Sequence, residues 1–198
     1  STKAEDEIIW STLPPQERAA RLVRAGAPAI GVTLKVSQDA EVLARSNVVL
    51  EGYWNQPEET GAALGDGWFH TGDGGMIDDD GYLTIQDRKK DVIITGGENV
   101  SSIEVEDVIF SHPEVAEVAV IGVPDEKWGE TIKALVVRVE GSDLREADLI
   151  AHCKAQAAHY KAPTSVEFRE ALARTATGKL QKYKLREPYW EGRDRRVN

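Results

Sequence analysis

The chain has 198 residues, of which 41% are hydrophobic and 29% are charged, so it is long enough for one medium domain or two small ones. Its net charge of -10 argues against a nucleic-acid-binding protein, because such proteins usually carry a basic domain. Cys153 is the single cysteine, which excludes an internal disulfide, and no apolar run has the length of a membrane span or a signal peptide. We therefore expect a cytoplasmic protein with no transmembrane segment and no nucleic-acid partner.

The first part of the chain is predicted to consist of short β-strands separated by turns. Val32, Leu34 and Val36 alternate with other residues, as in a half-buried strand. Residues 79–81 carry the Asp-Gly signal of a tight hairpin turn, and the alternative of a calcium loop fails on ligand spacing. The other expected strand segments are residues 42–43, 48–50, 68–71, 75–77 and 82–85.

The second part alternates strands with helices. Ser101 and Glu104 form a capping-box pattern that predicts a helix ending near Pro113, and Asp143 and Glu146 predict a second helix up to about residue 159. The expected strands are residues 92–94, 115–121, 131–139 and 166–168, with a loop over residues 123–130. This order predicts an α+β fold.

The charge pattern places a domain boundary at Asp87. Residues 1–87 hold 15 acidic and 6 basic side chains, whereas residues 88–198 are nearly balanced, with 19 and 18. The basic groups of the second part are the type that a polyanionic nucleotide attracts, although from charge alone a solvated surface is the favoured interpretation. We expect the charged end, residues 193–198, to be frayed.

One lysine stands on a loop that contains glycine and two threonines. Gly178 before Lys179 permits close backbone approach, and the hydroxyls of Thr175 and Thr177 suit local hydrogen bonds. The segment is not a Walker loop, because Leu180 replaces the Ser/Thr and Ala173 stands at the first Gly position. A cation presented in this way suits the developing charge of a phosphoryl or carboxyl transition state.

Three segments in this order, residues 68–73, 87–100 and 174–182, resemble the adenylate-forming (AMP-binding) acyl-CoA synthetase superfamily. That superfamily includes aryl-CoA ligases, luciferases and peptide-synthetase adenylation domains, and the resemblance runs from about Gly26 to Lys179. It implies that residues 1–87 are the β-rich C-terminal end of a large adenylate-forming domain. It also implies that residues 88–198 are a mobile C-terminal AMP-binding lobe, with a short mixed sheet and packed helices.

The resemblance implies an ATP-dependent acid-thiol ligase. A carboxylic acid reacts with ATP to give an acyl-adenylate and pyrophosphate, and CoA then displaces AMP to give a thioester. The family's phosphate loop and acidic metal-binding segment precede these motifs and have no match here, so Mg²⁺ is expected only in the full-length enzyme, with no metal ligand in this chain. We therefore expect a fragment that is inactive alone and whose partner is the missing N-terminal domain.

The resemblance also implies roles for individual residues. Lys179 bridges the carboxylate and the α-phosphate of ATP, and Asp73 accepts hydrogen bonds from both ribose hydroxyls. Gly96 and Gly97 line the pantetheine tunnel, although a glycine pair that simply makes a turn is an equally good interpretation. The remaining implied positions are Arg88, Lys90 and Asn99 at the nucleotide and Asp87 at the hinge.

Two alternatives remain open from the sequence. Instead of part of an acyl-CoA ligase, the chain could be an adenylation fragment that loads a carrier protein, or a non-catalytic remnant that binds nucleotide or CoA. This sequence departs from the family over residues 35–46, a segment that is shorter than usual and lacks the Gly-Glu-Ile-type strand common in relatives. The register of the local β-strands is therefore left open.

Overall fold

A computed structural model describes residues 3–193 of the chain, which divides into two compact units, residues 1–89 and 90–198. Almost all of the predicted frayed end lies outside the described residues. Within residues 3–193, no helix combines the length and the apolar character needed to cross a membrane.

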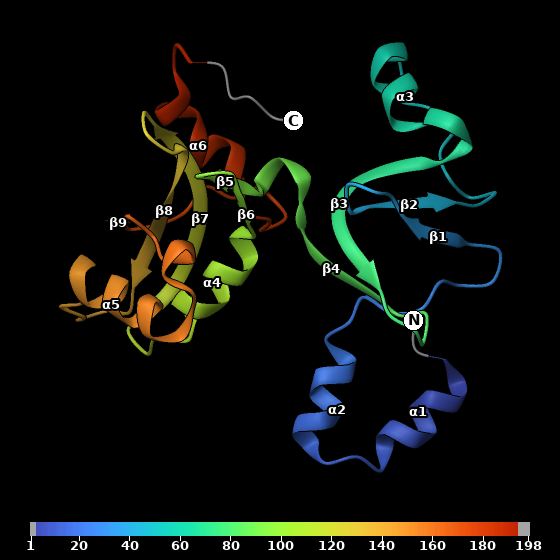
Figure 1. Ribbon diagram of the computed structural model, residues 1–198, viewed down its shortest axis with the longest axis horizontal. Coiled ribbons are helices and arrows are strands. Elements are labelled where there is room, and N and C mark those ends of the chain that lie inside the picture. Colours follow the sequence, from blue (N-terminus) through green and yellow to red (C-terminus); the bar gives the residue numbers. More distant parts are fainter. Residues whose placement is uncertain (1–2, 194–198) are drawn as a thin grey trace. The chain divides into compact units, whose positions relative to one another are not determined.

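The first unit is built on a four-stranded antiparallel sheet (Figure 1). Its strands, in both chain order and sheet order, are β1 (Thr33–Val36), β2 (Glu41–Arg45), β3 (Phe69–Ile77) and β4 (Leu83–Arg88). Its helices are α1 (Ala4–Ser11), α2 (Pro15–Leu22), α3 (Pro57–Ala63) and the short 3₁₀ turn η1 (Gly65–Gly67). Trp10 of α1 packs against Tyr82 at the β3–β4 turn, with ring centroids 5.1 Å apart.

The sequence predictions for this unit are mostly confirmed. The Asp-Gly turn joins β3 to β4, with Gly81 at φ +80° and the Asp78 carboxylate accepting the Tyr82 N–H. The two short strands expected at residues 68–71 and 75–77 are parts of the single strand β3. The strand expected at residues 42–43 is confirmed as part of β2, whose pairing with β1 and β3 gives the register that the sequence left open. The strand expected at residues 48–50 is wrong, because these residues form no strand.

The second unit contains a five-stranded mixed sheet with helices on both faces (Figure 1). Its strands are β5 (Ile93–Thr95), β6 (Glu98–Val100), β7 (Val115–Asp125), β8 (Gly129–Arg138) and β9 (Ser165–Phe168), in the order β6-β5-β8-β7 with β9 parallel to β8. Its helices are α4 (Ser102–Phe110), α5 (Glu146–Gln156) and α6 (Lys182–Trp190), with the 3₁₀ turn η3 (His159–Lys161). A further 3₁₀ turn, η2 (Lys89–Asp91), spans the boundary between the two units.

Alternation along β7 explains why helices pack on both faces of this sheet. Val120 lies in a buried cluster with residues of α4 and α5, whereas its neighbours Ala119 and Ile121 lie in a second cluster with Leu185 of α6. Cys153 belongs to the first cluster, where burial raises the pKa of its thiol to about 11. The thiol is therefore a packing group.

Two boundary predictions in this unit are wrong. Residues 123–125 and 129–130 belong to β7 and β8, so the expected loop shrinks to a tight connection. Pro124 is tolerated there because β7 is an edge strand, where a missing N–H disrupts no inner ladder. The second helix begins at Glu146 without a side-chain cap, whereas the Ser101 cap of α4 is confirmed by its 3.3 Å bond from the Glu104 N–H.

Candidate nucleotide and catalytic sites

The first candidate site lies on a bulge in strand β3. Glu41 of β2 is opposite Gly74 and Leu43 is opposite His70, so two steps along β2 correspond to four steps along β3. The additional length is taken up by residues 71–73, with Gly72 at φ +72°. Bulges of this kind re-aim side chains, and this one presents Asp73.

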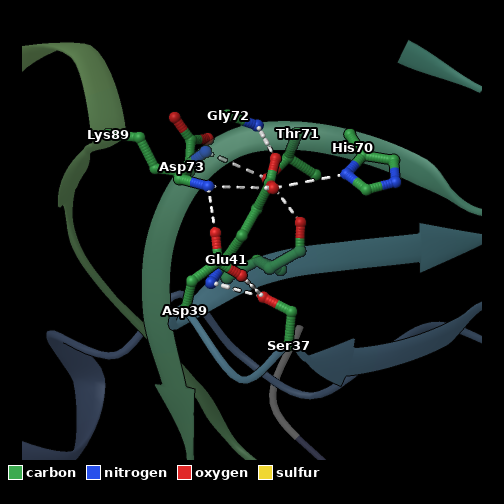
Figure 2. Close-up of polar contacts among 9 residues, drawn as sticks. Ser37, Asp39, Glu41, His70, Thr71, Gly72, Asp73 and Lys89 are labelled. Carbon is green, nitrogen blue, oxygen red and sulfur yellow. Dashed lines mark hydrogen bonds and ion pairs between the residues drawn. The ribbon is translucent and has the colours of Figure 1, made fainter. Parts of the chain in front are cut away.

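Polar groups beneath the bulge hold its backbone (Figure 2). The Thr71 hydroxyl donates to the Val42 carbonyl (2.7 Å) and accepts the Asp73 N–H (3.1 Å). The Gly72 N–H donates to the Glu41 carboxylate at 3.0 Å. The segment that carries Asp73 is therefore hydrogen-bonded at consecutive positions.

Asp73 and Arg88 are brought together as a directly opposed pair across β3 and β4. The Arg88 Nε lies 3.5 Å from the Asp73 Oδ1, and the two side chains are 63% and 35% exposed. An ion pair this exposed contributes little to stability, about 0–1 kcal/mol. Both groups thus remain accessible to a ligand that offers hydroxyls and phosphates.

Asp87, the expected hinge, lies inside β4 opposite Gly74 rather than in a loop. Its side chain is buried, and its Oδ1 accepts the Arg88 N–H at 2.7 Å. An aspartate tolerates the left-handed backbone conformation better than most residues, but Asp87 does not adopt it, since its φ angle is not positive. The hinge role stays a prediction.

Lys89 is an anchoring residue that the sequence analysis missed. Its ammonium pairs with the Asp39 carboxylate and lies 3.4 Å from the Glu41 Oε2. The hydrogen bond from Lys89, with a further bond from the Ser37 hydroxyl, lowers the pKa of Asp39 to about 2. The basic run at residues 88–90 indicated in the sequence that charged groups gather here. Only the structure shows that Arg88 is exposed whereas Lys89 is partly buried.

Lys90 and Asn99, the weaker nucleotide predictions, belong to the second unit. The carbonyl of Lys90 accepts a hydrogen bond from Arg186 at 2.9 Å, and its side chain is exposed. Asn99 is exposed on β6 opposite Ile94. Neither belongs to the unit that carries Asp73 and Arg88.

Gly96 and Gly97 form the two-residue turn between β5 and β6. Their φ angles are +59° and +86°, and positive φ at both central residues is what a type I′ hairpin turn requires. A Cβ at Gly96 would lie 2.9 Å from the Trp128 ring, whereas a Cβ at Gly97 would meet nothing within 4 Å. The turn itself therefore requires both glycines, and Trp128 restricts Gly96 further.

Replacing Gly96 with Ala is therefore expected to destabilise the second unit more than replacing Gly97. Each alanine costs about 1–2 kcal/mol of left-handed backbone strain, and the Gly96 variant adds displacement of Trp128. Denaturant unfolding of the chain measures both, with Gly141→Ala as a control for strain at an open glycine with φ +80°. Equal losses for the Gly96 and Gly97 variants would contradict the steric role of Trp128.

The second candidate site is the hairpin loop that ends at Lys179. Arg174 and Leu180 form a β-bridge, and the Thr175 N–H donates to the Lys179 carbonyl at 2.8 Å. As expected, the threonine hydroxyls bond locally, with Thr175 Oγ1 accepting the Lys179 N–H (3.0 Å) and lying 2.9 Å from Thr177 Oγ1. Gly178 has a φ of +83°, which makes the loop tight.

Lys179 is exposed at the end of this rigid loop. No ion pair or hydrogen bond joins its ammonium to any other side chain within residues 3–193. Arg174, which the sequence analysis did not single out, clamps the loop by donating to the Gly178 carbonyl (2.8 Å) and to the Glu117 carboxylate (2.7 Å). The backbone is thus fixed, and the cation is directed to solvent.

Comparison with known proteins matches this chain to C-terminal segments of larger enzymes. The family model described as the AMP-binding enzyme C-terminal domain matches residues 104–179. The long-chain-fatty-acid–CoA ligase FadD13 of Mycobacterium tuberculosis is 51% identical over 151 residues, covering 76% of this chain and 30% of that enzyme. The 2-methylpropanoate–CoA ligase CCL4 of Humulus lupulus is 42% identical over 195 residues, covering 90% of this chain and 35% of that enzyme.

A solved structure agrees with these sequence matches. The ATP-bound structure of MatB from Rhodopseudomonas palustris superposes with a TM-score of 0.80 at 38% identity, covering 84% of this chain and 36% of that chain. The chain therefore spans about a third of the length of the proteins that it matches.

Proposed function

This chain belongs to the AMP-binding enzyme superfamily, matching the C-terminal portion of its members, and on that premise we propose that it is the C-terminal part of an acyl-CoA synthetase. The intact enzyme activates a carboxylic acid with ATP and transfers the acyl group to CoA. The observation that supports this proposal most directly is the exposed Lys179 ammonium on its hydrogen-bonded loop, at the end of the segment that matches the family.

In the first half-reaction, an oxygen of the acid attacks the α-phosphorus of ATP, and the bond to pyrophosphate breaks. Negative charge grows on the oxygens around phosphorus, and the Lys179 ammonium stabilises it as a mobile point charge. The fixed backbone of the loop means that only the side chain needs to be ordered when the substrates bind.

Asp73 and Arg88 hold the nucleotide in this proposal. A single carboxylate has enough acceptor capacity for two ribose hydroxyls, and Asp73 is presented by the bulge with its side chain accessible. The Arg88 guanidinium, placed directly opposite, is suited to a phosphate or to a second ribose contact. Lys90 and Asn99 remain proposed nucleotide contacts, and Asp87 remains the proposed hinge between the two units.

In the second half-reaction, the CoA thiol attacks the acyl carbonyl, loses its proton, and AMP leaves. We propose that the intact enzyme uses Mg²⁺, which would neutralise charge on the ATP phosphates. Within residues 3–193, no three His, Cys, Asp or Glu side chains gather as they would to hold a metal. That this chain supplies no Mg²⁺ ligand stays an expectation. The missing N-terminal domain and a cytoplasmic location also remain proposals.

A panel of carboxylic acids tests this function in the enzyme that carries the chain. We expect release of pyrophosphate that depends on the acid, followed by a thioester only when CoA is present. Acyl transfer to a carrier protein but not to CoA would favour the adenylation-domain alternative. If no acid in the panel supports pyrophosphate release, the result would favour the alternative of a non-catalytic remnant.

The proposed tunnel at Gly97 predicts a separation of the two half-reactions. A leucine there would obstruct pantetheine, so Gly97→Leu is expected to slow thioester formation about tenfold or more while changing adenylate formation by less than about twofold. Single-turnover assays of each step measure this difference. Gly141→Leu carries similar backbone strain at an open glycine and controls for it, and equal losses in both steps would refute the tunnel.

A further inference from the structure

We propose that Glu41 is a positioning residue of the nucleotide site, which ties together the two strand ends that carry Asp73 and Arg88. This inference rests on the proposed function. It gives a positioning role to a residue that is not proposed to contact the acid, ATP or CoA. It starts from an unusual feature, a carboxylate that is buried in the first unit.

Glu41 is only 7% exposed, and burial of a carboxylate is costly unless its oxygens are bonded. Oε1 accepts the Gly72 N–H at 3.0 Å. Oε2 lies 3.3 Å from the His70 Nδ1 and 3.4 Å from the Lys89 Nζ (Figure 2). Both oxygens are therefore occupied: Oε1 by the β3 backbone, and Oε2 by His70 of β3 and by Lys89, which follows β4.

The two strands that meet at Glu41 are the ones that carry the nucleotide pair. Gly72 immediately precedes Asp73 in the β3 bulge, and Lys89 immediately follows Arg88 at the end of β4. The pairing register of β2 and β3 shifts at the bulge. At this point the Glu41 carboxylate accepts a hydrogen bond from the Gly72 backbone N–H. One side chain thus fixes the neighbours of both Asp73 and Arg88.

Loss of this carboxylate would release the bulge at its most flexible residue. Gly72 has a φ of +72° and no side chain, so its conformation depends on its surroundings and on the bond to Glu41. Lys89 would keep Asp39, an exposed partner, and lose its buried one. We therefore expect the Asp73 carboxylate to lose its fixed orientation.

The ionised form of Glu41 is the one that the surroundings favour. Burial raises its pKa, but the bonds from the Gly72 N–H and His70 and the charge of Lys89 outweigh burial and lower the pKa below its ordinary value. At neutral pH the carboxylate accepts all three contacts.

The test compares ATP with 2′-deoxy-ATP in acid-dependent ATP–pyrophosphate exchange by the intact enzyme. If Asp73 binds the ribose hydroxyls, the unaltered enzyme prefers ATP by about tenfold or more in kcat/KM, the effect expected for a hydrogen bond to a charged group. Glu41→Ala is expected to reduce this preference to about threefold or less. Simple destabilisation lowers activity with both nucleotides equally and leaves the ratio unchanged.

Two further variants make the result specific. Glu41→Gln retains an acceptor for the Gly72 N–H. In this variant, the logarithm of the kcat/KM ratio for ATP over 2′-deoxy-ATP is expected to be at least half of its value in the unaltered enzyme. Glu130→Gln alters a similarly buried carboxylate, 6% exposed and 3.4 Å from the Ile94 N–H in the second unit, and is expected to leave the preference unchanged.

The outcomes separate this inference from the proposed function. An unaltered enzyme without exchange activity overturns the function itself, and the positioning role falls with it. An active enzyme that prefers ATP equally before and after Glu41→Ala overturns the positioning role and leaves the function intact.

Discussion

Replacing Lys179 with Ala is expected to lower the rate of adenylate formation by about 100- to 1,000-fold, the range measured when one preorganised charge-stabilising group is removed from a transition state. The loss should appear in kcat rather than in KM, because the proposed contact strengthens as charge grows on the α-phosphate. Acid-dependent ATP–pyrophosphate exchange by the intact enzyme measures it. The fold should be unaffected, since the ammonium is exposed and the loop is held by backbone groups and by Arg174.

Lys154→Ala is a matched control for this variant, because it removes an exposed lysine from α5 in the same unit. Its exchange rate should stay within about twofold of the unaltered enzyme, as is usual for surface substitutions away from a site. Equal rates for the two variants would remove Lys179 from the chemistry.

Replacing Asp73 with Ala is expected to raise the KM for ATP about 10- to 100-fold with a smaller change in kcat, because hydrogen bonds to a charged acceptor contribute about 1.5–3 kcal/mol. The ribose does not react, so its contacts are made to a similar extent in the ground state and the transition state. Initial rates over a range of ATP concentrations measure the change. Loss of the exposed Asp73–Arg88 pair should hardly alter stability.

Asp79→Ala controls for the loss of an acidic side chain in the same unit. Asp79 is exposed at the far end of the β3–β4 hairpin, so the KM for ATP should not change. A KM for ATP that is the same in Asp73→Ala as in the control would refute the ribose assignment.

Local signals in the sequence were sufficient to predict much of the fold. The Asp-Gly turn before Tyr82, the Ser101 cap and the β-branched run at residues 115–121 each depend on neighbours in the chain, and each has the expected structure. The α+β class follows from their order, whereas the mixed sheet was implied by the family resemblance. Helix α2 was missed although Pro15 occupies its first turn, a known start signal, because the helix has no buried residue to mark an apolar face.

The parts that could not be predicted depend on contacts between distant residues. Lys89 meets Asp39 and Glu41 from 50 and 48 residues away, and no spacing rule connects them. The β3 bulge likewise arises from a mismatch between two strands, which only their pairing reveals. The motifs therefore indicate Asp73, Arg88 and Lys179, whereas the residues that hold them, Glu41 and Arg174, emerge only from the structure.

In the proposed mechanism, Lys179 serves adenylate formation and not acyl transfer. The most direct measurement supplies preformed acyl-adenylate and CoA to the Lys179→Ala enzyme and follows thioester formation in a single turnover. We predict a rate within about threefold of the unaltered enzyme, although the same variant hardly forms adenylate from acid and ATP. Equal rate losses in both half-reactions would refute this role, because they would mean that this lysine supports the whole lobe and not one transition state.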